Sequence, residues 1–173
     1  MQERCKIGVV IGNANSPHAV NIMKGVDQAS KECDVQLMYF MNVSSPYTAQ
    51  LYPPDKSIGW DYQKSAIYDY ARYVKADVLI MTYGMMSIFM KSDYGKQYLE
   101  YFRNVPCVLI NEQTDRPNWT SIIVDNYNGM YELVEHLVRD HGYHNFAFLA
   151  GPPGNTDACQ RKRAFLDVMK KYD

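Results

Sequence analysis

The sequence predicts an α/β protein built on a doubly wound parallel sheet. Short apolar runs alternate with amphipathic segments along the 173 residues. The first run, residues 6–12, is almost continuously apolar, as in a strand that is covered on both faces. The stretch 121–165 then reads as strand, crossover helix, strand and glycine turn opening a further helix. We therefore expect right-handed crossovers with helices on both faces of the sheet.

The first strand, 6–12, leads through a polar turn into a helix that extends to about Cys33. Ser16 is placed to cap this helix, and Pro17 fits its first turn. The second strand is 35–40. Residues 41–60 are loop-like and long for a connection inside one domain, so we interpret them as a functional loop or an insertion. Apolar residues recur at helical spacing in the first helix: Ala19, Ile22, Met23, Val26 and Ala29.

The rest of the chain continues the alternation. Helix 61–75 precedes strand 77–82, and helix 92–103 precedes strand 105–110. Strand 121–124 leads into helix 127–141, strand 145–150 and helix 157–172. The residues that we predict to face inward are Ala66, Ile67, Tyr70, Ala71 and Val74 in the first of these helices, Tyr98, Leu99 and Phe102 in the second, and Met130, Leu133, Val134 and Leu137 in the third.

Composition excludes several classes of function. The net charge of -1 gives no electrostatic footprint for nucleic acid or for an anionic membrane. No apolar run approaches the ~20 residues of a membrane helix. The cysteines, Cys5, Cys33, Cys107 and Cys159, show no CxxC and no metal spacing. Cys33 and Cys107 read as core residues. With no visible secretory signal, we predict a cytoplasmic protein that uses no cofactor or metal.

The four histidines are interpreted from their positions. His136 and His141 are five residues apart on different faces of the predicted helix, so they lack the i, i+4 geometry of a zinc site. His141 and His144 are expected to close that helix together with Gly142. His18 follows the first strand, where packing at the helix start and contact with a ligand are equally open interpretations.

Enzyme motifs are not found in the sequence. There is no GxxxxGK[ST], GxGxxG or GxSxG pattern. The segment 151–154, Gly-Pro-Pro-Gly, resembles a phosphate loop only in glycine content, and its prolines remove backbone donors that such a loop needs. An α/β enzyme acting on a small polar substrate remains the alternative, with Glu112 and His18 as the available base and acid.

Polar and aromatic side chains gather where the predicted strands end. Adjacent parallel strands share their carboxyl edge, so these groups converge in space. They supply the directional hydrogen bonds and the flat apolar face that a sugar or other polyol needs. Taken singly, each Asn or Asp could equally serve only to end a strand. The residues are Asn13, Asn15, Ser16 and His18, then Tyr83, Met85 and Ser87, then Asn111 and Glu112, and finally Asp125 and Asn126.

A basic run, Arg161-Lys-Arg163, stands near the front of the last helix. We interpret Lys162 and Arg163 as a solvated face. Arg161 can turn toward the carboxyl edge, where its guanidinium offers forked donors to hydroxyls or to a carboxylate.

With these residues in hand, the chain resembles the effector-binding domain of the LacI/GalR family of bacterial regulators, which have the periplasmic-binding-protein type I fold. The matching segments are KIGVVI, DVLIMTYG, PCVLIN and, most specifically, VDNYNGMYELVEHLVRDHGYHNFAFLAGPP followed by Arg161-Lys-Arg-Ala-Phe165. The sequence departs from the family pattern at His141-Gly142, where Gly-His is usual, at Ala164, where Gly is usual, and in the long loop 41–60. Only five residues precede Lys6, where the family's DNA-binding segment would stand.

The resemblance implies a non-enzymatic sensory domain that binds a sugar or sugar derivative in a cleft between two lobes. It implies an N-terminal lobe over residues 1–142, nearly complete, and the first strand and helix of a second lobe over 143–173. It further implies a homodimer and an output domain outside this chain. The net charge of -1 and the lack of a helix-turn-helix before Lys6 predict no direct contact of this piece with nucleic acid, and the lack of a long apolar run predicts none with a membrane. The effector contacts would fall on Asn13, Asn15, Ser16, His18, Tyr83, Met85, Ser87, Asn111, Asp125 and Arg161.

The segment 140–161, DHGYHNFAFLAGPPGNTDACQR, is similar to LacI-like sensor domains that are fused to diguanylate cyclases or histidine kinases. Because most of a second lobe is missing from the 173 residues, we expect weak effector binding by this chain alone. Strand 145–150 would likewise have no sheet of its own lobe, so we expect it to pair with another chain or to pack irregularly.

Overall fold

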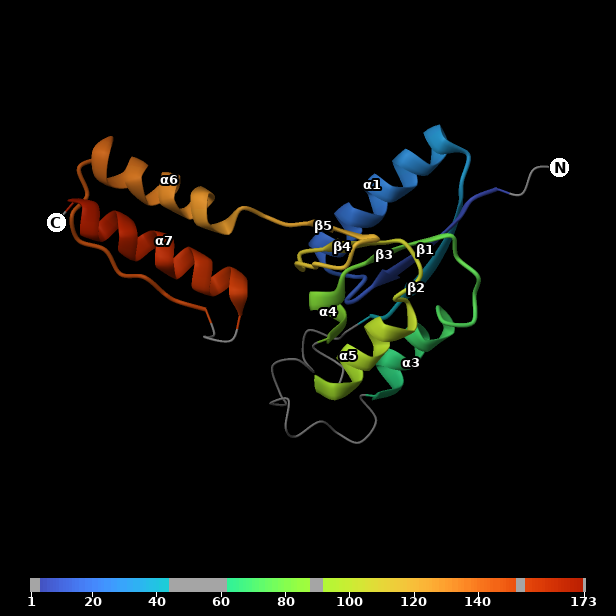
Figure 1. The fold of residues 1–173 in the computed structure, drawn as a ribbon. Coiled ribbons are helices and arrows are strands. Elements are labelled where there is room, and N and C mark those ends of the chain that lie inside the picture. The colour runs from blue at the N-terminus through green and yellow to red at the C-terminus, as the bar shows by residue number, and fades with distance from the viewer. Residues whose placement is uncertain (1–3, 44–61, 88–91, 152–154, 173) are drawn as a thin grey trace. The chain divides into compact units, whose positions relative to one another are not determined.

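The computed structural model describes residues 4–43, 62–87, 92–151 and 155–172 (Figure 1). It divides into two compact units, Met1–Ile123 and Val124–Asp173. The first unit contains one five-stranded sheet in which all neighbouring strands are parallel. Its strands are β1 (Lys6–Ile11), β2 (Gln36–Met41), β3 (Val78–Met81), β4 (Cys107–Ile110) and β5 (Trp119–Ile122). The described helices are α1 (Pro17–Cys33), α3 (Tyr62–Tyr70), α4 (Tyr83–Ser87) and α5 (Ser92–Tyr101) in the first unit, and α6 (Asn126–Arg139) and α7 (Thr156–Tyr172) in the second.

The strand order is β2-β1-β3-β4-β5, so the chain reverses its direction of winding at β1. The crossover from β1 goes to one side, and all later strands are added on the other side. A doubly wound sheet of this order has its topological switch point between β1 and β3, and the carboxyl ends of those strands open a crevice for ligands. The doubly wound parallel sheet that the sequence predicted is confirmed.

Side chains of β1 alternate between the two faces of the sheet. Val9 and Ile11 are fully buried on the face that α1 covers, together with Ala19 of that helix. Val10 is fully buried on the opposite face, in a cluster with Tyr68 of α3 and Tyr98 of α5. Burial on both faces explains why this strand reads as a continuous apolar run.

The first helix begins and ends as its sequence predicts. The Ser16 hydroxyl accepts a hydrogen bond from the Ala19 N–H at 3.2 Å, and Pro17 occupies the first turn. The helix ends at Cys33 because Asp34 adopts a left-handed conformation with φ 46°. Cys33 itself is exposed, so its predicted place in the core is wrong.

The second predicted helix is shorter than expected and presents a different face. After Tyr70 the backbone tightens, because the N–H groups of residues 71–73 bond to carbonyls three residues earlier. Tyr68 is fully buried and hydrogen-bonded, whereas Tyr70 is 62% exposed. The inward prediction for Tyr70 is therefore wrong, and that for Ala71, 2% exposed, is confirmed.

Strand β5 begins two residues earlier than the predicted strand 121–124. Trp119 anchors it, because the indole is buried and its Nε1–H donates to the Val105 carbonyl at 3.1 Å. Arg116 lies over the same indole, 4.4 Å from its centroid. Ile123 and Val124, which the sequence placed in the strand, are more than half exposed.

The strand predicted over residues 145–150 is not formed. A strand needs a hydrogen-bonding neighbour, and no described strand pairs with this segment. It is held instead by its aromatic side chains: Phe148 stacks on Phe165 of α7, with centroids 4.7 Å apart, and Phe146 meets the same ring edge-on.

The second unit is a pair of helices, α6 and α7, that lie side by side (Figure 1). Val134 and Val138 of α6 are buried against Val168 of α7. The division between the two compact units falls between Ile123 and Val124, so α6 and α7 belong to the same unit. Leu133, predicted to face inward, is 53% exposed on the opposite side of α6.

Cys107 in β4 provides a test of the core. Its side chain is buried in the cluster that contains Tyr98, and burial raises the pKa of the thiol to about 12. Cys5, Cys33 and Cys159 are exposed.

We expect the three exposed thiols to react with an aromatic disulfide reagent at pH 8 in the native protein, and Cys107 to react only after denaturation. Native reaction of a fourth thiol at the same rate would contradict this placement of β4, and Cys107→Ala identifies the slow group.

Candidate functional site

The carboxyl ends of β1 and β3 meet in a contact that leaves no space for a side chain at residue 12. The Gly12 N–H donates to the Thr82 hydroxyl oxygen at 3.1 Å. A Cβ built on Gly12 would lie 2.6 Å from the Met85 carbonyl carbon and oxygen. The first turn of α4 is thereby held against the loop that leaves β1. We call the residues around this contact the rim: Gly12–His18, Thr82–Met85 and Asn111.

The loop after β1 is also held from the β2 side, by Asn42. The Oδ1 of Asn42 accepts from the Asn13 N–H at 2.8 Å, and its carbonyl accepts from the Ala14 N–H at 2.8 Å. Asn42 is 6% exposed, and Asn13 has a left-handed φ of 52°. Sequence reasoning missed Asn42 and Thr82, although each directly follows an apolar run, because nothing local marks their partners.

Two predicted ligand contacts meet at the rim. The Nδ2 of Asn111, after β4, lies 2.9 Å from the Nε2 of His18, at the start of α1. Since β3 lies between β1 and β4, this pair spans the carboxyl end of β3. An amide nitrogen can only donate, so His18 accepts at Nε2 and carries its proton on Nδ1. Asn111 has φ 60°, and its N–H donates to Ile122 O at 2.8 Å.

The α4 residues serve as packing residues as much as rim residues. Tyr83 packs against the core on the α5 face, with its hydroxyl beside Gly95. Burial, and to a lesser degree the charge of Glu112, raises the pKa of Tyr83. Met85 packs on the opposite face, against the α1 cluster. Ser87 ends α4, and its side chain lies outside the described residues.

The remaining residues of the first loop differ in availability. The Ser16 hydroxyl oxygen is engaged in capping α1, which leaves its hydroxyl proton for another acceptor. Asn15 and His18 are exposed. The rim therefore presents an imidazole and amides from two loops.

Asp125 and Arg161 both contact residues at the amino end of α6, in the second unit. Asp125 caps α6, and its two carboxylate oxygens accept from the Asn128 N–H at 3.0 Å and from the Asn128 Nδ2 at 2.7 Å. The first of these bonds is the main reason that the pKa of Asp125 is lowered. Arg161 donates to the Oδ1 of Asn126, which is buried at the start of α6. Both residues thus organise the amino end of α6.

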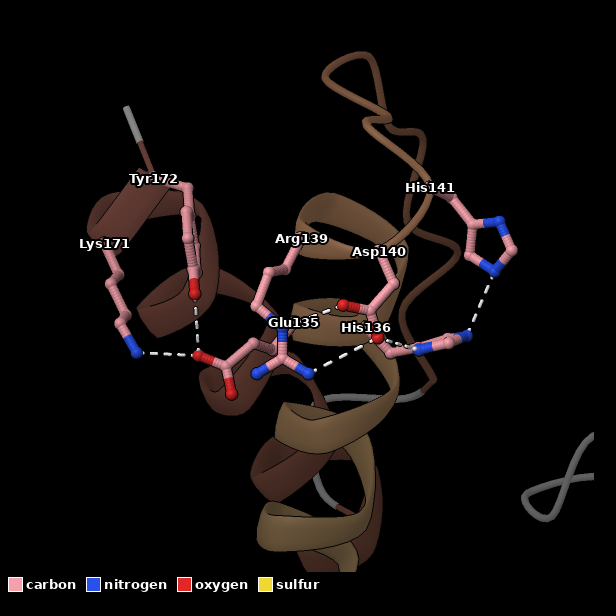
Figure 2. A network of polar contacts seen from close by, with 7 residues as sticks. All are labelled: Glu135, His136, Arg139, Asp140, His141, Lys171 and Tyr172. Carbon is pink, nitrogen blue, oxygen red and sulfur yellow. Dashed lines mark hydrogen bonds and ion pairs between the residues drawn. The ribbon is translucent and has the colours of Figure 1, made fainter.

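The two histidines that the sequence separated are neighbours. The Nε2 atoms of His136 and His141 lie 3.0 Å apart (Figure 2). The prediction treated residues 136–141 as one helix, whereas α6 ends at Arg139, before His141. Gly142, with φ 67°, closes the helix as predicted.

A cavity of about 420 Å³ lies at the other end of the sheet. Its lining comes from 71–76 and from Tyr101, Phe102 and Val105, which precede β3 and β4. Arg72 covers Tyr101, with its guanidinium carbon 3.4 Å from the ring centroid. This cavity is separate from the rim, because it is built by the segments that enter the strands.

The helices of the described ranges include none that is both long enough and apolar enough to span a membrane. Within the same ranges, no group of three or more His, Cys, Asp or Glu side chains is arranged to hold a metal ion.

Comparison with known proteins identifies similar chains. No protein-family model matches the sequence. It is 26% identical to the "Probable HTH-type transcriptional repressor ExuR" of Bacillus subtilis (strain 168) over 114 residues, which are 60% of this chain and 34% of ExuR.

Two solved structures resemble nearly the whole chain. The lac repressor dimer bound to operator and the anti-inducer ONPF matches with a TM-score of 0.68 and 17% identity, covering 99% of this chain and 52% of the repressor. A periplasmic solute-binding protein of an ABC transporter from Actinobacillus succinogenes 130z, with bound D-allose, matches with a TM-score of 0.70 and 18% identity, covering 98% and 56%. The chain therefore has the fold that these proteins share, and it spans about one third of the curated relative and about half of each solved structure.

The close approach at residue 12 yields a stability prediction. Gly12→Ala should lower the free energy of unfolding by about 1–3 kcal/mol, because the new methyl group meets backbone that cannot move aside. Gly25→Ala is the matched control, because a Cβ built on this helical glycine has no neighbouring atom within 4 Å. It should raise the free energy of unfolding by about 0.5–1 kcal/mol. Urea unfolding measures both values, and equal effects would contradict the contact.

The role of Thr82 is tested by two substitutions of similar size. Thr82→Val leaves the buried Gly12 N–H without an acceptor and should cost about 1–3 kcal/mol of unfolding free energy. Thr82→Ser keeps the hydroxyl and should retain the slow hydrogen exchange of the Gly12 amide, whereas the valine variant should lose it. Protection of that amide in the valine variant would show that the hydroxyl is not its partner.

Proposed function

We propose that this chain senses a small polar molecule, a sugar or sugar derivative, as part of a LacI/GalR-type bacterial regulator. The observation that carries the proposal is the approach of His18 and Asn111 across the carboxyl end of β3. Their side chains stand at the topological switch point, where parallel sheets of this order bind ligands. The rim supplies amides, hydroxyls and an imidazole, with the Glu112 carboxylate beside Gly84, and such a set of donors and acceptors suits hydroxyl-rich ligands.

The similar proteins support the same class of ligand. The solute-binding protein holds D-allose, and the lac repressor dimer holds the anti-inducer ONPF. These relatives are repressors and a solute-binding protein, so they do not favour the alternative of an enzyme that uses Glu112 and His18.

The proposal includes a two-lobed sensor with the ligand bound between its lobes, and this part rests on the family resemblance. The proposed contacts are Asn13, Asn15, Ser16, His18, Asn111, the α4 residues, Asp125 and Arg161. We propose lobes over residues 1–142 and 143–173, as the family resemblance implies. Ligand binding then favours one of two arrangements of the lobes, and an output domain responds to the change.

The output that we propose is transcriptional repression through a DNA-binding domain, supported by the sequence match to a repressor. A diguanylate cyclase or histidine kinase output rests only on the resemblance of segment 140–161. We further propose a homodimer that acts in the cytoplasm.

The proposal is tested by amide NMR spectra of the chain during titration with neutral monosaccharides, sugar acids and sugar phosphates. We expect one class to shift the amides of the rim, above all Asn13, Thr82 and Asn111, with saturation in the millimolar range, about 1 mM or weaker. The chain spans about half the length of each of these structural relatives. Tight binding in calorimetry would contradict that expectation.

Variants distinguish a ligand site from general surface effects. His18→Ala and Asn111→Ala should each weaken the response at least tenfold, whereas Gln28→Ala on an exposed turn of α1 should leave it unchanged. Shifts that cluster around Arg72 and Tyr101, or no shift with any sugar, would overturn the proposal. Turnover of glycosides or phosphosugars that is lost in His18→Ala and Glu112→Ala would favour the enzyme.

A further inference from the structure

The carboxyl end of α6 is closed by a turn at Gly142, directly after His141. Gly142 has φ 67°, and its N–H donates to the Val138 carbonyl at 3.0 Å. The N–H of Tyr143 donates to the Leu137 carbonyl at 3.2 Å. These bonds cap the last turn, so the position of residue 141 is set by the backbone.

The result is a pair of imidazoles that meet through the same atom. The Nε2 atoms of His136 and His141 lie 3.0 Å apart, and the ring planes are at 86° (Figure 2). One Nε2 donates the shared proton and the other offers its lone pair, so at least one of the rings is neutral. Two imidazole nitrogens this close can both become ligands of one metal ion after a small reorientation of the rings.

Each ring is oriented by a second contact. The Nδ1 of His136 lies 2.7 Å from the Oδ2 of Asp140, and the Oδ1 of that carboxylate accepts from Arg139 Nε at 2.8 Å. Arg139 Nη2 also lies 3.3 Å from the Oδ2 of Asp140, so the carboxylate that contacts His136 is held by Arg139 through both of its oxygens. With its proton held on Nδ1, His136 presents Nε2 as a lone pair.

The side chains next to this pair make contacts that do not involve the two Nε2 atoms. His141 stacks on Tyr143, with planes 11° apart and centroids separated by 5.7 Å. Glu135 is turned toward α7, where its Oε1 accepts from Lys171 Nζ at 2.6 Å and from the Tyr172 hydroxyl at 2.9 Å (Figure 2). The side chain of His136 is 51% exposed, so a solvated ion can reach the pair.

We propose that His136 and His141 form a binding site for a divalent transition-metal ion, with their two Nε2 atoms as ligands and Asp140 as the group that orients His136. Two nitrogens at ~2.0–2.1 Å from a tetrahedral ion are separated by about 3.3–3.4 Å. The observed 3.0 Å therefore needs to widen by only a few tenths of an ångström when a metal replaces the shared proton.

The chemistry of the site limits which ion it takes. The described residues provide two protein ligands here, so water fills the other coordination positions. Imidazole ligands suit Zn²⁺, Ni²⁺ and Cu²⁺, whereas Mg²⁺ and Ca²⁺ prefer oxygen. An open site with two ligands binds and releases its ion readily. This inference does not depend on the proposed sugar site, because it uses only residues at the end of α6.

The test is a titration of the 173-residue chain with Zn²⁺, followed by the ¹⁵N resonances of the histidine side chains. Coordination should shift the Nε2 resonances of His136 and His141 in a saturable way and leave those of His18 and His144 in place. Side-chain resonances are resolved residue by residue, so zinc bound elsewhere, for example at the exposed cysteines, is distinguished.

Matched variants identify the ligands. His136→Asn and His141→Asn should each lower the affinity of the shifted site at least tenfold, and Asp140→Asn should lower it by about 10–100-fold. His144→Asn, an exposed histidine outside the pair, is the control and should bind as the parent does. Circular dichroism confirms that each variant is folded. Unshifted Nε2 resonances at saturating zinc, or equal losses in the control, would overturn the proposal.

Discussion

The contact of two backbones at Gly12 is the constraint on which the candidate site depends. The carboxyl end of β1 and the first turn of α4 come so close that a single methyl group would overlap the Met85 carbonyl. Thr82 ties the two segments with a buried hydrogen bond to the Gly12 N–H. Because this contact fixes both loops at the switch point of the sheet, the side chains beyond it are presented from a rigid support.

The rest of the rim follows from that support. Asn42 holds the loop after β1 from the β2 side, through bonds to the N–H groups of residues 13 and 14. The start of α1 then brings His18 to Asn111 over the end of β3. Polar groups that follow three of the strands therefore lie at one edge of the sheet. Next to them, Tyr83 packs against the core on one face of the sheet, and Met85 packs against the core on the other face.

The second unit uses polar contacts differently. Asp125 and Arg161 carry the residue types of a ligand site, yet in the structure they cap α6 and join it to α7 through Asn128 and Asn126. A residue can hold both roles if ligand binding exchanges one set of hydrogen bonds for another, and this is the change that a two-state sensor requires. At the carboxyl end of α6, beside the turn at Gly142, His136 contacts His141.

The sequence by itself determined the features that depend on local pattern. Apolar runs predicted the positions of β1, β2, β3 and β4 to within one or two residues, and they placed the start of β5 two residues too late. Ser16 and Pro17 predicted the start of α1. The alternation of strands and helices predicted the doubly wound sheet. Only the tertiary structure decided which partners meet across long separations. Thr82 and Gly12 are 70 residues apart, and Asn111 and His18 are 93 apart, so no local signal links them.

Where the sequence misled, the physical reason was also tertiary. The apolar segment 145–150 has the composition of a strand, but it lacks a pairing neighbour among the described strands and packs its phenylalanines on α7. His136 and His141 lie on different faces of an ideal helix, but the helix ends between them. Periodicity therefore determined which segments become strands and helices, whereas neighbours and chain reversals decided which side chains meet, because hydrogen bonds and packing act across space and not along the sequence.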